Sequence, residues 1–492
     1  MTSLRARAAH PLAPAVLAAI LFAAALRPGP FGLATIPAAA LLAQALAAAP
    51  TRRPAAFATF LAALGPGTVA ALPLAPVAPT AALPVAVAYA ATFALAGAAA
   101  GPARPGAPLG PARAGRFLAT WLALEGLASL EVGTLMGHPG ASLPYLTLGA
   151  GVADTPWRGV GALGGPRATT LVVLGGGVGL TALARAARAR RPRGAAAAAG
   201  LVVALAAAPL ATSALAHPVA PPDADVLAVR LVQHAPREAE LAAARFDAAL
   251  ARAHATALRR ATLAPDPHAG DGPTDRLVVW PEGVLPRPVE DLDVPPALLP
   301  SGVDVVFGAG RDVPGGVANA GLLWRDGTLT VLADKRRTVP FAEADLVRGD
   351  RRPPTRIHGA RVAVLSCWEV AFPEAAREAA RDGADAILVL ANDAYAAGGP
   401  VTELHLRQAR LRAAEVGLPV VFVQATGPSG AFDAAGGAIV RLPAGVPAHA
   451  DADVPLDGRL TPFRATGDGP WTASLVALVG GLVARRPKGG EA

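Results

Sequence analysis

Hydrophobic positions divide this chain into two parts with different patterns. Over the first 217 residues, long Ala-, Leu- and Val-rich runs alternate with short basic segments. Each run has about 17–22 residues, enough for a helix to cross a bilayer. The runs lie at 10–26, 32–49, 55–73, 80–100, 116–135, 168–184 and 195–215, and a shorter one follows at about 470–485. The pattern predicts seven transmembrane helices in residues 1–217 and an eighth, with a cytoplasmic tail, in residues 468–492.

The second part, residues 220–465, has short apolar runs rich in β-branched residues, separated by amphipathic stretches. The runs lie at 226–232, 276–280, 303–308, 328–333, 361–366, 386–391 and 419–425, and the amphipathic stretches at 236–260, 373–382 and 402–416. Strands and helices in alternation predict an α/β domain with helices layered on sheet. About 245 residues suffice for one domain with a full core.

Composition agrees with this division. The chain is 53% hydrophobic and 16% charged, with a mean hydropathy of +0.42. These values are typical of a polytopic membrane protein that carries a polar domain. The net charge of +8 comes from Arg clusters between apolar runs, without interleaved aromatic residues, so bilayer orientation explains it better than nucleic-acid binding.

The positions of the basic residues predict the topology. Every second loop is basic, as expected of cytoplasmic loops. With the N-terminus inside, seven crossings place residues 220–465 outside the cytoplasm. The first run also resembles a signal peptide, but the spans that follow favour an uncleaved helix. The basic clusters are Arg5 and Arg7; Arg52 and Arg53; Arg104, Arg113 and Arg116; Arg185, Arg188, Arg190, Arg191 and Arg193; and Arg485, Arg486 and Lys488.

Three residues with reactive side chains each follow a predicted strand of the polar domain. Cys367 is the only cysteine, Lys335 is one of two lysines, and Glu282 follows the run RLVVW. Taken singly, each has an ordinary interpretation as a buried thiol, a solvated ammonium or a loop carboxylate. Three such side chains at strand ends predict instead a joint site at one edge of a sheet.

The sequences around these residues resemble the nitrilase superfamily of carbon–nitrogen hydrolases. VVWPEGVLP is similar to its Glu motif, ADKRRTVPFAE to its Lys motif and SCWEVAFPE to its Cys motif. Together with the predicted spans, the pattern resembles the apolipoprotein N-acyltransferases. Further similar segments contain the chain's two asparagines, Asn319 and Asn392. Some loops depart from the family pattern, with FAEA where FGEY-like sequence is usual.

The resemblance implies an α-β-β-α sandwich and a catalytic triad of Glu282, Lys335 and Cys367. Cys367 would attack a phospholipid ester, Glu282 would move the proton, and Lys335 with the backbone N–H of Trp368 would stabilise the oxyanion. A nearby ammonium would also lower the thiol pKa. The acyl chain would then pass from a Cys thioester to the N-terminal amine of a diacylglyceryl-modified apolipoprotein.

By the same resemblance, Glu343 and Glu369 would support the site, although either could be an ordinary surface carboxylate. Glu374 and Asp393 are interpreted as structural. Candidate lid loops lie at 342–356 and 394–403. The histidines are scattered without metal-binding spacing, so no metal and no cofactor are expected.

The expected location is a bacterial inner (cytoplasmic) membrane, with the polar domain on the extracytoplasmic side and a monomer as the default state. Two alternatives remain open. A membrane-anchored amidase or nitrilase would use the same three residues, whereas a transporter or scaffold with a decayed hydrolase-like domain would need none of them.

Overall fold

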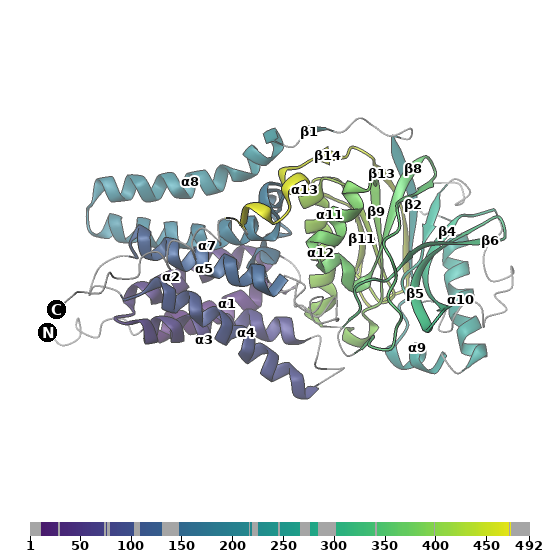
Figure 1. Cartoon of the computed structure of the whole chain (residues 1–492), viewed down its shortest axis with the longest axis horizontal. Coiled ribbons are helices and arrows are strands. Elements are labelled where there is room, and N and C mark those ends of the chain that lie inside the picture. The colour runs from purple at the N-terminus through teal and green to yellow at the C-terminus, as the bar shows by residue number, and fades with distance from the viewer. Residues whose placement is uncertain are drawn as a thin grey trace, which may run out of the picture.

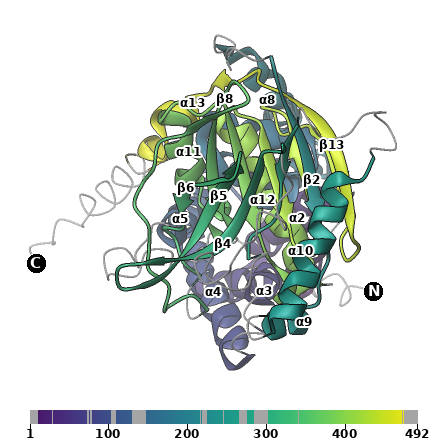
Figure 2. The same ribbon diagram turned by 90° about the vertical axis from the view of Figure 1, so that its right-hand side faces the viewer.

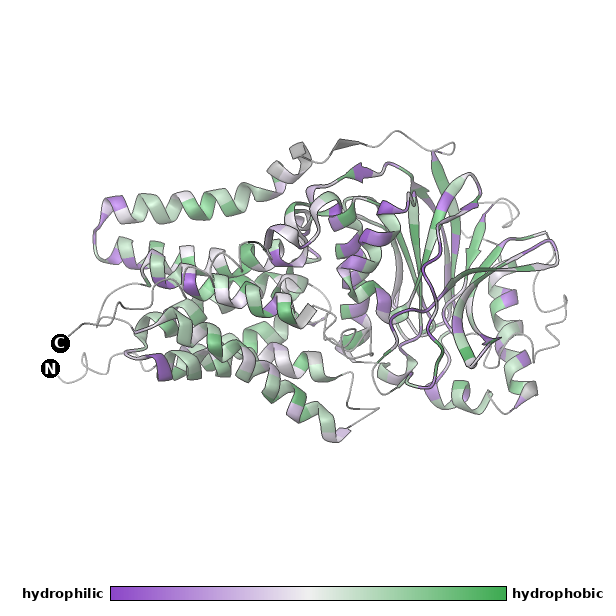
Figure 3. Ribbon diagram, in the orientation of Figure 1, coloured by the Kyte–Doolittle hydropathy of each residue, from purple (hydrophilic) through white to green (hydrophobic). Residues whose placement is uncertain are grey.

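The molecule combines a bundle of apolar helices with a sandwich of two β-sheets (Figure 1). The computed structural model describes residues 11–27, 30–72, 75, 79–102, 109–129, 147–215, 217–218, 225–244, 247–265, 276–283, 302–339, 342–397, 399–471 and 473. The bundle is predominantly hydrophobic, whereas polar residues gather in the sandwich and at the ends of the bundle helices (Figure 3).

Each apolar run predicted in the first part coincides with a helix or overlaps one. The helices are α1 (Leu12–Ala25), α2 (Thr35–Ala48), α3 (Arg52–Ala71), α4 (Pro79–Ala100), α5 (Pro111–Ser129), α7 (Gly161–Arg188) and α8 (Pro192–Leu215). In the described part of the chain, four segments are long and apolar enough to cross a membrane: Phe31–Ala48, Pro79–Ala100, Pro156–Arg188 and Pro192–Leu210. The run at 470–485 lies almost wholly outside the described residues, so the number eight stays a prediction.

Small residues allow the bundle helices to pack closely. A Cβ added at Gly65 of α3 would lie 2.0 Å from the Ala19 carbonyl oxygen of α1. A Cβ at Gly177 of α7 would lie 2.5 Å from Ala39 of α2. Larger side chains at these glycines would force the helices apart, as expected for membrane bundles that associate through small residues.

Two six-stranded sheets form the sandwich. One has the order β13-β2-β3-β4-β5-β6 and the other β12-β11-β10-β9-β8-β7. The first contains β2 (Val226–Gln233), β3 (Leu277–Val279), β4 (Val305–Val313), β5 (Gly316–Arg325), β6 (Thr328–Asp334) and β13 (Ala448–Pro455). The second contains β7 (Thr355–Ile357), β8 (Ala360–Ser366), β9 (Ala386–Ala391), β10 (Val420–Gln424), β11 (Ser429–Phe432) and β12 (Ala438–Leu442). All seven predicted strands are present, whereas β5, β7, β11, β12 and β13 were not predicted.

Helices cover both outer faces of the sandwich, which gives the α-β-β-α order expected from the resemblance. Helices α9 (Glu238–Ala244) and α10 (Ala248–Leu263) lie over the sheet that contains β2 and β4 (Figure 2). Helices α11 (Pro373–Arg381) and α12 (Pro400–Val416) lie between the other sheet and the bundle (Figure 1). The two facing sheets share a buried core, to which β2 contributes Leu231 and β8 contributes Val362.

Parallel pairing brings several strand ends to one edge. Strand β8 pairs in parallel with β9, and β9 with β10; in the other sheet, β2, β3 and β4 are parallel neighbours. Chain segments that follow these strands therefore meet at the carboxyl edges of the sheets, where binding sites of α/β folds usually lie.

Candidate active site

Lys335 lies directly after β6 and is held between two carboxylates. Its Nζ donates to Glu282 Oε1 at 3.0 Å and to Glu343 Oε1 at 2.7 Å. The Lys335 side chain is 1% exposed, so these are ion pairs shielded from water. A buried ammonium needs such partners because desolvation of an isolated charge costs several kcal/mol.

Strand β5, one of the strands that were not predicted, completes the surroundings of this lysine. Asn319 of β5 donates through Nδ2 to Glu282 Oε1 at 2.7 Å, and its carbonyl oxygen accepts from the Lys335 N–H at 2.7 Å. A Cβ at Gly308 of β4 would lie 2.6 Å from Glu282 Cα, so this position must be small for Glu282 to approach the sheet. Strands β3, β4, β5 and β6 thus jointly fix the Glu282–Lys335 pair.

Cys367 begins the short helix η7 (Cys367–Ala371), immediately after β8. Its φ of 47° is left-handed, which is uncommon for a residue with a side chain and is typical of sharp turns at functional sites. Ser366 and Glu369 form a capping box at the start of η7. Trp368 is buried and its ring lies edge-on to Phe372 at 5.9 Å.

Glu369 connects the loop of Cys367 to the loop of Lys335. Its Oε2 accepts from the Ser366 N–H at 3.0 Å. Its Oε1 accepts from the backbone N–H groups of Arg336 at 2.9 Å and Arg337 at 3.2 Å. Glu343 acts within the loop of Lys335, because its Oε1 accepts from Lys335 and its Oε2 accepts from the Val339 N–H at 2.7 Å. Both carboxylates are hydrogen-bonded through both oxygens, and neither is a free surface group.

Burial and charge shift the pKa values of these groups. Burial raises the pKa of Glu282, Lys335 lowers it and Glu343 raises it, with a net rise. Burial lowers the pKa of Lys335, but Glu282 and Glu343 raise it well above the usual range, so Lys335 is an ammonium. Burial and Glu282 raise the pKa of the Cys367 thiol, and the lowering by Lys335 is smaller.

The expected lowering of the thiol pKa by Lys335 is present, but it is not the largest effect on Cys367. Lys335 does lower the thiol pKa, but burial and the neighbouring carboxylate outweigh it, so the pKa lies well above its ordinary value. A neutral thiol has to lose its proton as it attacks, and the raised pKa of Glu282 makes this carboxylate a stronger base than an ordinary glutamate.

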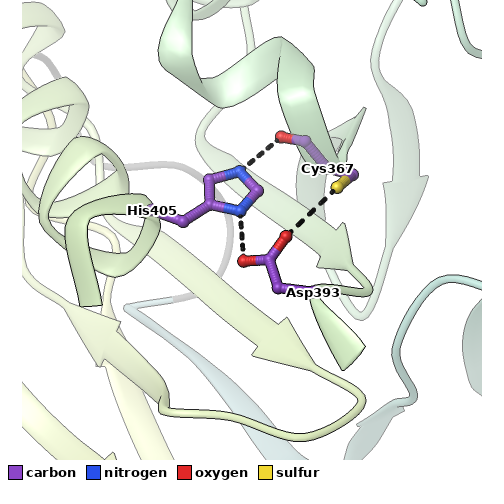
Figure 4. Close-up of side chains that lie close together, drawn as sticks. All are labelled: Cys367, Asp393 and His405. Atoms are coloured by element: carbon purple, nitrogen blue, oxygen red, sulfur yellow. Dashed lines mark hydrogen bonds and ion pairs between the residues drawn. The ribbon is translucent and has the colours of Figure 1, made fainter. Parts of the chain in front are cut away.

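Asp393 and His405, which the sequence reasoning left without a role in the site, lie next to Cys367 (Figure 4). Cys367 Sγ lies 3.9 Å from Asp393 Oδ1, and His405 Nε2 lies 2.8 Å from the Cys367 carbonyl oxygen. His405 Nδ1 lies 2.7 Å from Asp393 Oδ2. All three residues are buried. The sequence signal for Asp393 was its position two residues after the buried run at 386–391.

Ligand atoms of Cys367, Asp393 and His405 all lie within 4.8 Å of one another, as in some metal sites. Hydrogen bonds, however, occupy both ring nitrogens of His405. The arrangement is therefore better described as a hydrogen-bonded chain behind the cysteine than as a set of metal ligands.

Comparison with known proteins identifies the domain. Residues 313–454 match the carbon–nitrogen hydrolase family, a region that includes Lys335 and Cys367 but begins after Glu282. The chain is similar to an apolipoprotein N-acyltransferase of Bradyrhizobium diazoefficiens, at 31% identity over 43% of this chain and 45% of the relative. It is also similar to one of Ralstonia nicotianae, at 28% identity over 76% of this chain and 72% of the relative.

A solved structure of an amidase from Nesterenkonia, a member of the nitrilase superfamily, covers 47% of this chain and 92% of its own length. The identity is 22% and the TM-score 0.36. The match to the Bradyrhizobium relative spans less than half of that protein's length.

Proposed function

We propose that this chain, a nitrilase-superfamily protein similar to apolipoprotein N-acyltransferases, moves a fatty acyl chain from a membrane phospholipid, through a thioester on Cys367, to the N-terminal amine of diacylglyceryl-cysteine on apolipoproteins. The observation that carries the proposal is the buried Glu282–Lys335–Glu343 cluster, in which Glu282 and Lys335 act on the chain's only thiol. The apolar bundle joined to this domain supports lipid-borne substrates.

In the first step, the Cys367 sulfur attacks the ester carbonyl of the phospholipid. The S–C bond forms while the thiol proton passes to Glu282, and the carbonyl oxygen becomes an oxyanion. The ammonium of Lys335 stabilises this charge together with a backbone N–H beside Cys367, for which that of Trp368 is the candidate. The ester C–O bond then breaks, and Glu282 returns the proton to the departing lysophospholipid oxygen.

In the second step, the amine of the lipoprotein attacks the thioester carbonyl. The N–C bond forms, Glu282 takes the amine proton, and the C–S bond breaks. The proton then returns to the sulfur, which restores the neutral thiol. Burial of Cys367 supports this scheme, because a thioester in a site shielded from water survives until the acceptor arrives.

The arrangement of basic residues supports an extracytoplasmic sandwich domain in a bacterial inner membrane. The turn between α7 and α8, which contains Arg190 and Arg191, lies at the end of the bundle away from the sheets (Figure 1). If this basic end faces the cytoplasm, the sandwich lies outside. Both substrates are then at the outer surface of the bilayer. A monomer contains all the residues that the scheme uses.

The test combines the protein in phospholipid vesicles with acyl-labelled phosphatidylethanolamine and a diacylglyceryl-cysteine peptide. We expect an acyl adduct on the intact protein, absent in Cys367→Ala, and transfer of the label to the peptide amine. Release of free fatty acid with no peptide acylation would instead support a membrane-anchored amidase-like hydrolase and reject the proposal. The absence of any adduct in the native chain would support a protein without enzymatic activity.

Replacement of Lys335 tests its assigned role. We expect Lys335→Ala to lower kcat about 100- to 1,000-fold, the usual effect of removing one oxyanion donor. Arg356→Ala on β7 is the control for the loss of a cation. The time course of the adduct mass measures the rate at which Cys367 is acylated. An unchanged rate in Lys335→Ala would contradict the role of Lys335 in stabilising the oxyanion.

A further inference from the structure

The backbone of Cys367 adopts a conformation that its own side chain does not favour. A φ of 47° places the residue in the left-handed region, where a Cβ approaches the following carbonyl oxygen. The turn at the end of β8 therefore needs external contacts to persist. The capping box holds the N–H of Ser366, but it does not contact the carbonyl group of Cys367.

His405 supplies that contact from α12. Its Nε2 lies 2.8 Å from the Cys367 carbonyl oxygen. Because a carbonyl oxygen can only accept, the Nε2 must carry a proton and donate it. His405 is 0% exposed and its ring stands edge-on to Phe422 at 5.1 Å, so the side chain has little freedom to turn away.

Asp393 fixes the ring from its other side. His405 Nδ1 lies 2.7 Å from Asp393 Oδ2, and Gln424 Nε2 donates to the same oxygen at 2.6 Å. With Nε2 already protonated, a short contact between Nδ1 and a carboxylate requires a second proton between them. The other Asp393 oxygen lies 3.9 Å from the Cys367 sulfur. Asp393 therefore contacts the nucleophile at its sulfur, and His405 contacts it at its carbonyl group.

We propose that His405 and Asp393 are positioning residues that hold Cys367 in its left-handed turn and so direct the sulfur toward Glu282 and Lys335. Neither residue takes part in proton transfer to the substrate. His405 acts through the carbonyl group of Cys367, and Asp393 acts by keeping the protonated Nε2 of His405 turned toward that group. The proposal deepens the proposed function, on which the turnover measurement below rests.

Two replacements of similar size separate the contacts of His405. The amide nitrogen of Gln reaches the position of Nε2 and can donate to the Cys367 carbonyl group, whereas that of Asn reaches the position of Nδ1 and contacts only Asp393. We expect His405→Gln to keep kcat within about threefold of the native value. We expect His405→Asn to lower kcat about 10- to 100-fold with KM nearly unchanged, as follows from loss of one strong hydrogen bond.

Alkylation provides a measurement that does not depend on acyl transfer. Cys367 is the only cysteine, so the rate of iodoacetamide addition reports on this residue alone. We expect His405→Asn to change this rate, while His405→Gln keeps it close to the native rate. If acyl transfer is absent from the native chain but the alkylation rates still separate Gln from Asn, the positioning role holds and the proposed function fails.

The control is His358→Gln, at the turn before β8 and so at the opposite end of the strand. His358 also pairs with a carboxylate, since its Nε2 lies 3.0 Å from Asp304 Oδ2. This variant should leave alkylation and turnover unchanged. Thermal unfolding of every variant shows whether folding is retained, and Asp393→Asn, whose amide can still hold the ring, should retain more turnover than Asp393→Leu.

Equal turnover and equal alkylation in His405→Gln and His405→Asn would overturn the proposal, because the two variants differ in the contact to Cys367. A parallel loss of melting temperature and activity in both variants would do the same, since it would assign His405 a general role in stability.

Discussion

Three charged side chains, Glu282, Lys335 and Glu343, share one buried position in this molecule. Two carboxylates around one ammonium give the cluster a net negative charge when all three are ionised. The carboxylates then oppose each other's ionisation, which is one reason why the pKa of Glu282 is raised after the larger effect of burial. The basicity of Glu282 therefore depends on Glu343 as well as on Lys335.

Glu343→Gln tests this dependence through the pH profile. Glu282 must be ionised to accept the thiol proton, so kcat/KM falls as the pH drops through its pKa. Since that pKa is raised, the fall begins at a higher pH than for an ordinary glutamate. Removal of the Glu343 charge lowers the pKa of Glu282. We expect the acidic limb of kcat/KM to move to lower pH.

The control for this experiment is Glu374→Gln. Glu374 pairs with Arg377 on α11, and its side chain is about half exposed. The profile of this variant should coincide with that of the native chain. An acidic limb that stays in place, or moves to higher pH, in Glu343→Gln would show that Glu343 does not control the basicity of Glu282.

Sequence reasoning found Glu282, Lys335 and Cys367 and left Asp393 and His405 without a role in the site. Scarcity singled out Cys367 and Lys335, and the positions after strands and the resemblance added Glu282. His405 lies within an amphipathic stretch, and the local sequence pattern does not predict that it contacts Cys367. The direction of the Cys367 pKa shift also could not be predicted, because it depends mainly on how deeply the thiol is buried.

Among the secondary-structure elements, the short helix η7 is the one on which the site depends most. Its first residue is Cys367, and Glu369 at its third position accepts three backbone N–H groups from two loops. A single buried carboxylate thus fixes the distance between the loop of the nucleophile and the loop of Lys335.

We expect Glu369→Ala to lower the free energy of unfolding by at least about 3 kcal/mol, since it leaves buried N–H groups of Ser366, Arg336 and Arg337 without their acceptor. Thermal or denaturant unfolding in detergent measures this change. Glu369→Gln keeps one acceptor oxygen and should lie between alanine and the native chain. Glu374→Ala, a half-exposed carboxylate on α11, should change stability by less than about 1 kcal/mol. Equal losses of stability in Glu369→Ala and Glu374→Ala would show that Glu369 does not hold the two loops together.

The predicted helices and strands agree with the structure where the hydrophobic pattern is regular. The buried strand at 386–391 and the amphipathic stretch at 373–382 correspond closely to β9 and α11. Strand β5 was missed because Gly316 and Gly321 interrupt its apolar pattern, and its assignment depends on antiparallel pairing with β4 and β6. Such pairing between strands is a tertiary effect that local propensity does not contain.

At the scale of the whole molecule, α12 joins the bundle to the nucleophile. His405 contacts the carbonyl group of Cys367, and Arg407, two residues further on, extends to the bundle. Arg407 donates to the Ala25 carbonyl at 3.1 Å and the Arg27 carbonyl at 2.7 Å, at the end of α1. One buried helix therefore sets the position of the candidate active site relative to the apolar helices, and hence to the lipid substrates of the proposed reaction.

Asp154, between α5 and α7, supplies the negative charge at the junction between α12 and the end of α1. Its replacement tests whether this junction matters. Asp154 accepts from Arg407 Nε at 2.8 Å and from Arg410 Nη1 at 2.6 Å. Arg407 is 1% exposed, so Asp154→Ala leaves a buried cation without its nearest counter-charge. We expect a loss of about 3 kcal/mol in the free energy of unfolding. Asp382→Ala, which breaks a partly exposed pair with Arg351, should cost at most about 1 kcal/mol.

Asp154→Ala should affect the rate of Cys367 alkylation and the rate of acyl transfer differently. Iodoacetamide reaches Cys367 from water, so its rate depends on the sandwich alone and should stay near that of Asp382→Ala. Acyl transfer from vesicle phospholipid also needs the sandwich held against the bundle, and it should fall by more than the alkylation rate in folded protein. If both rates fall together, the junction stabilises the nucleophile itself; if neither falls, the contact of α12 with the end of α1 has no part in presenting lipid to Cys367.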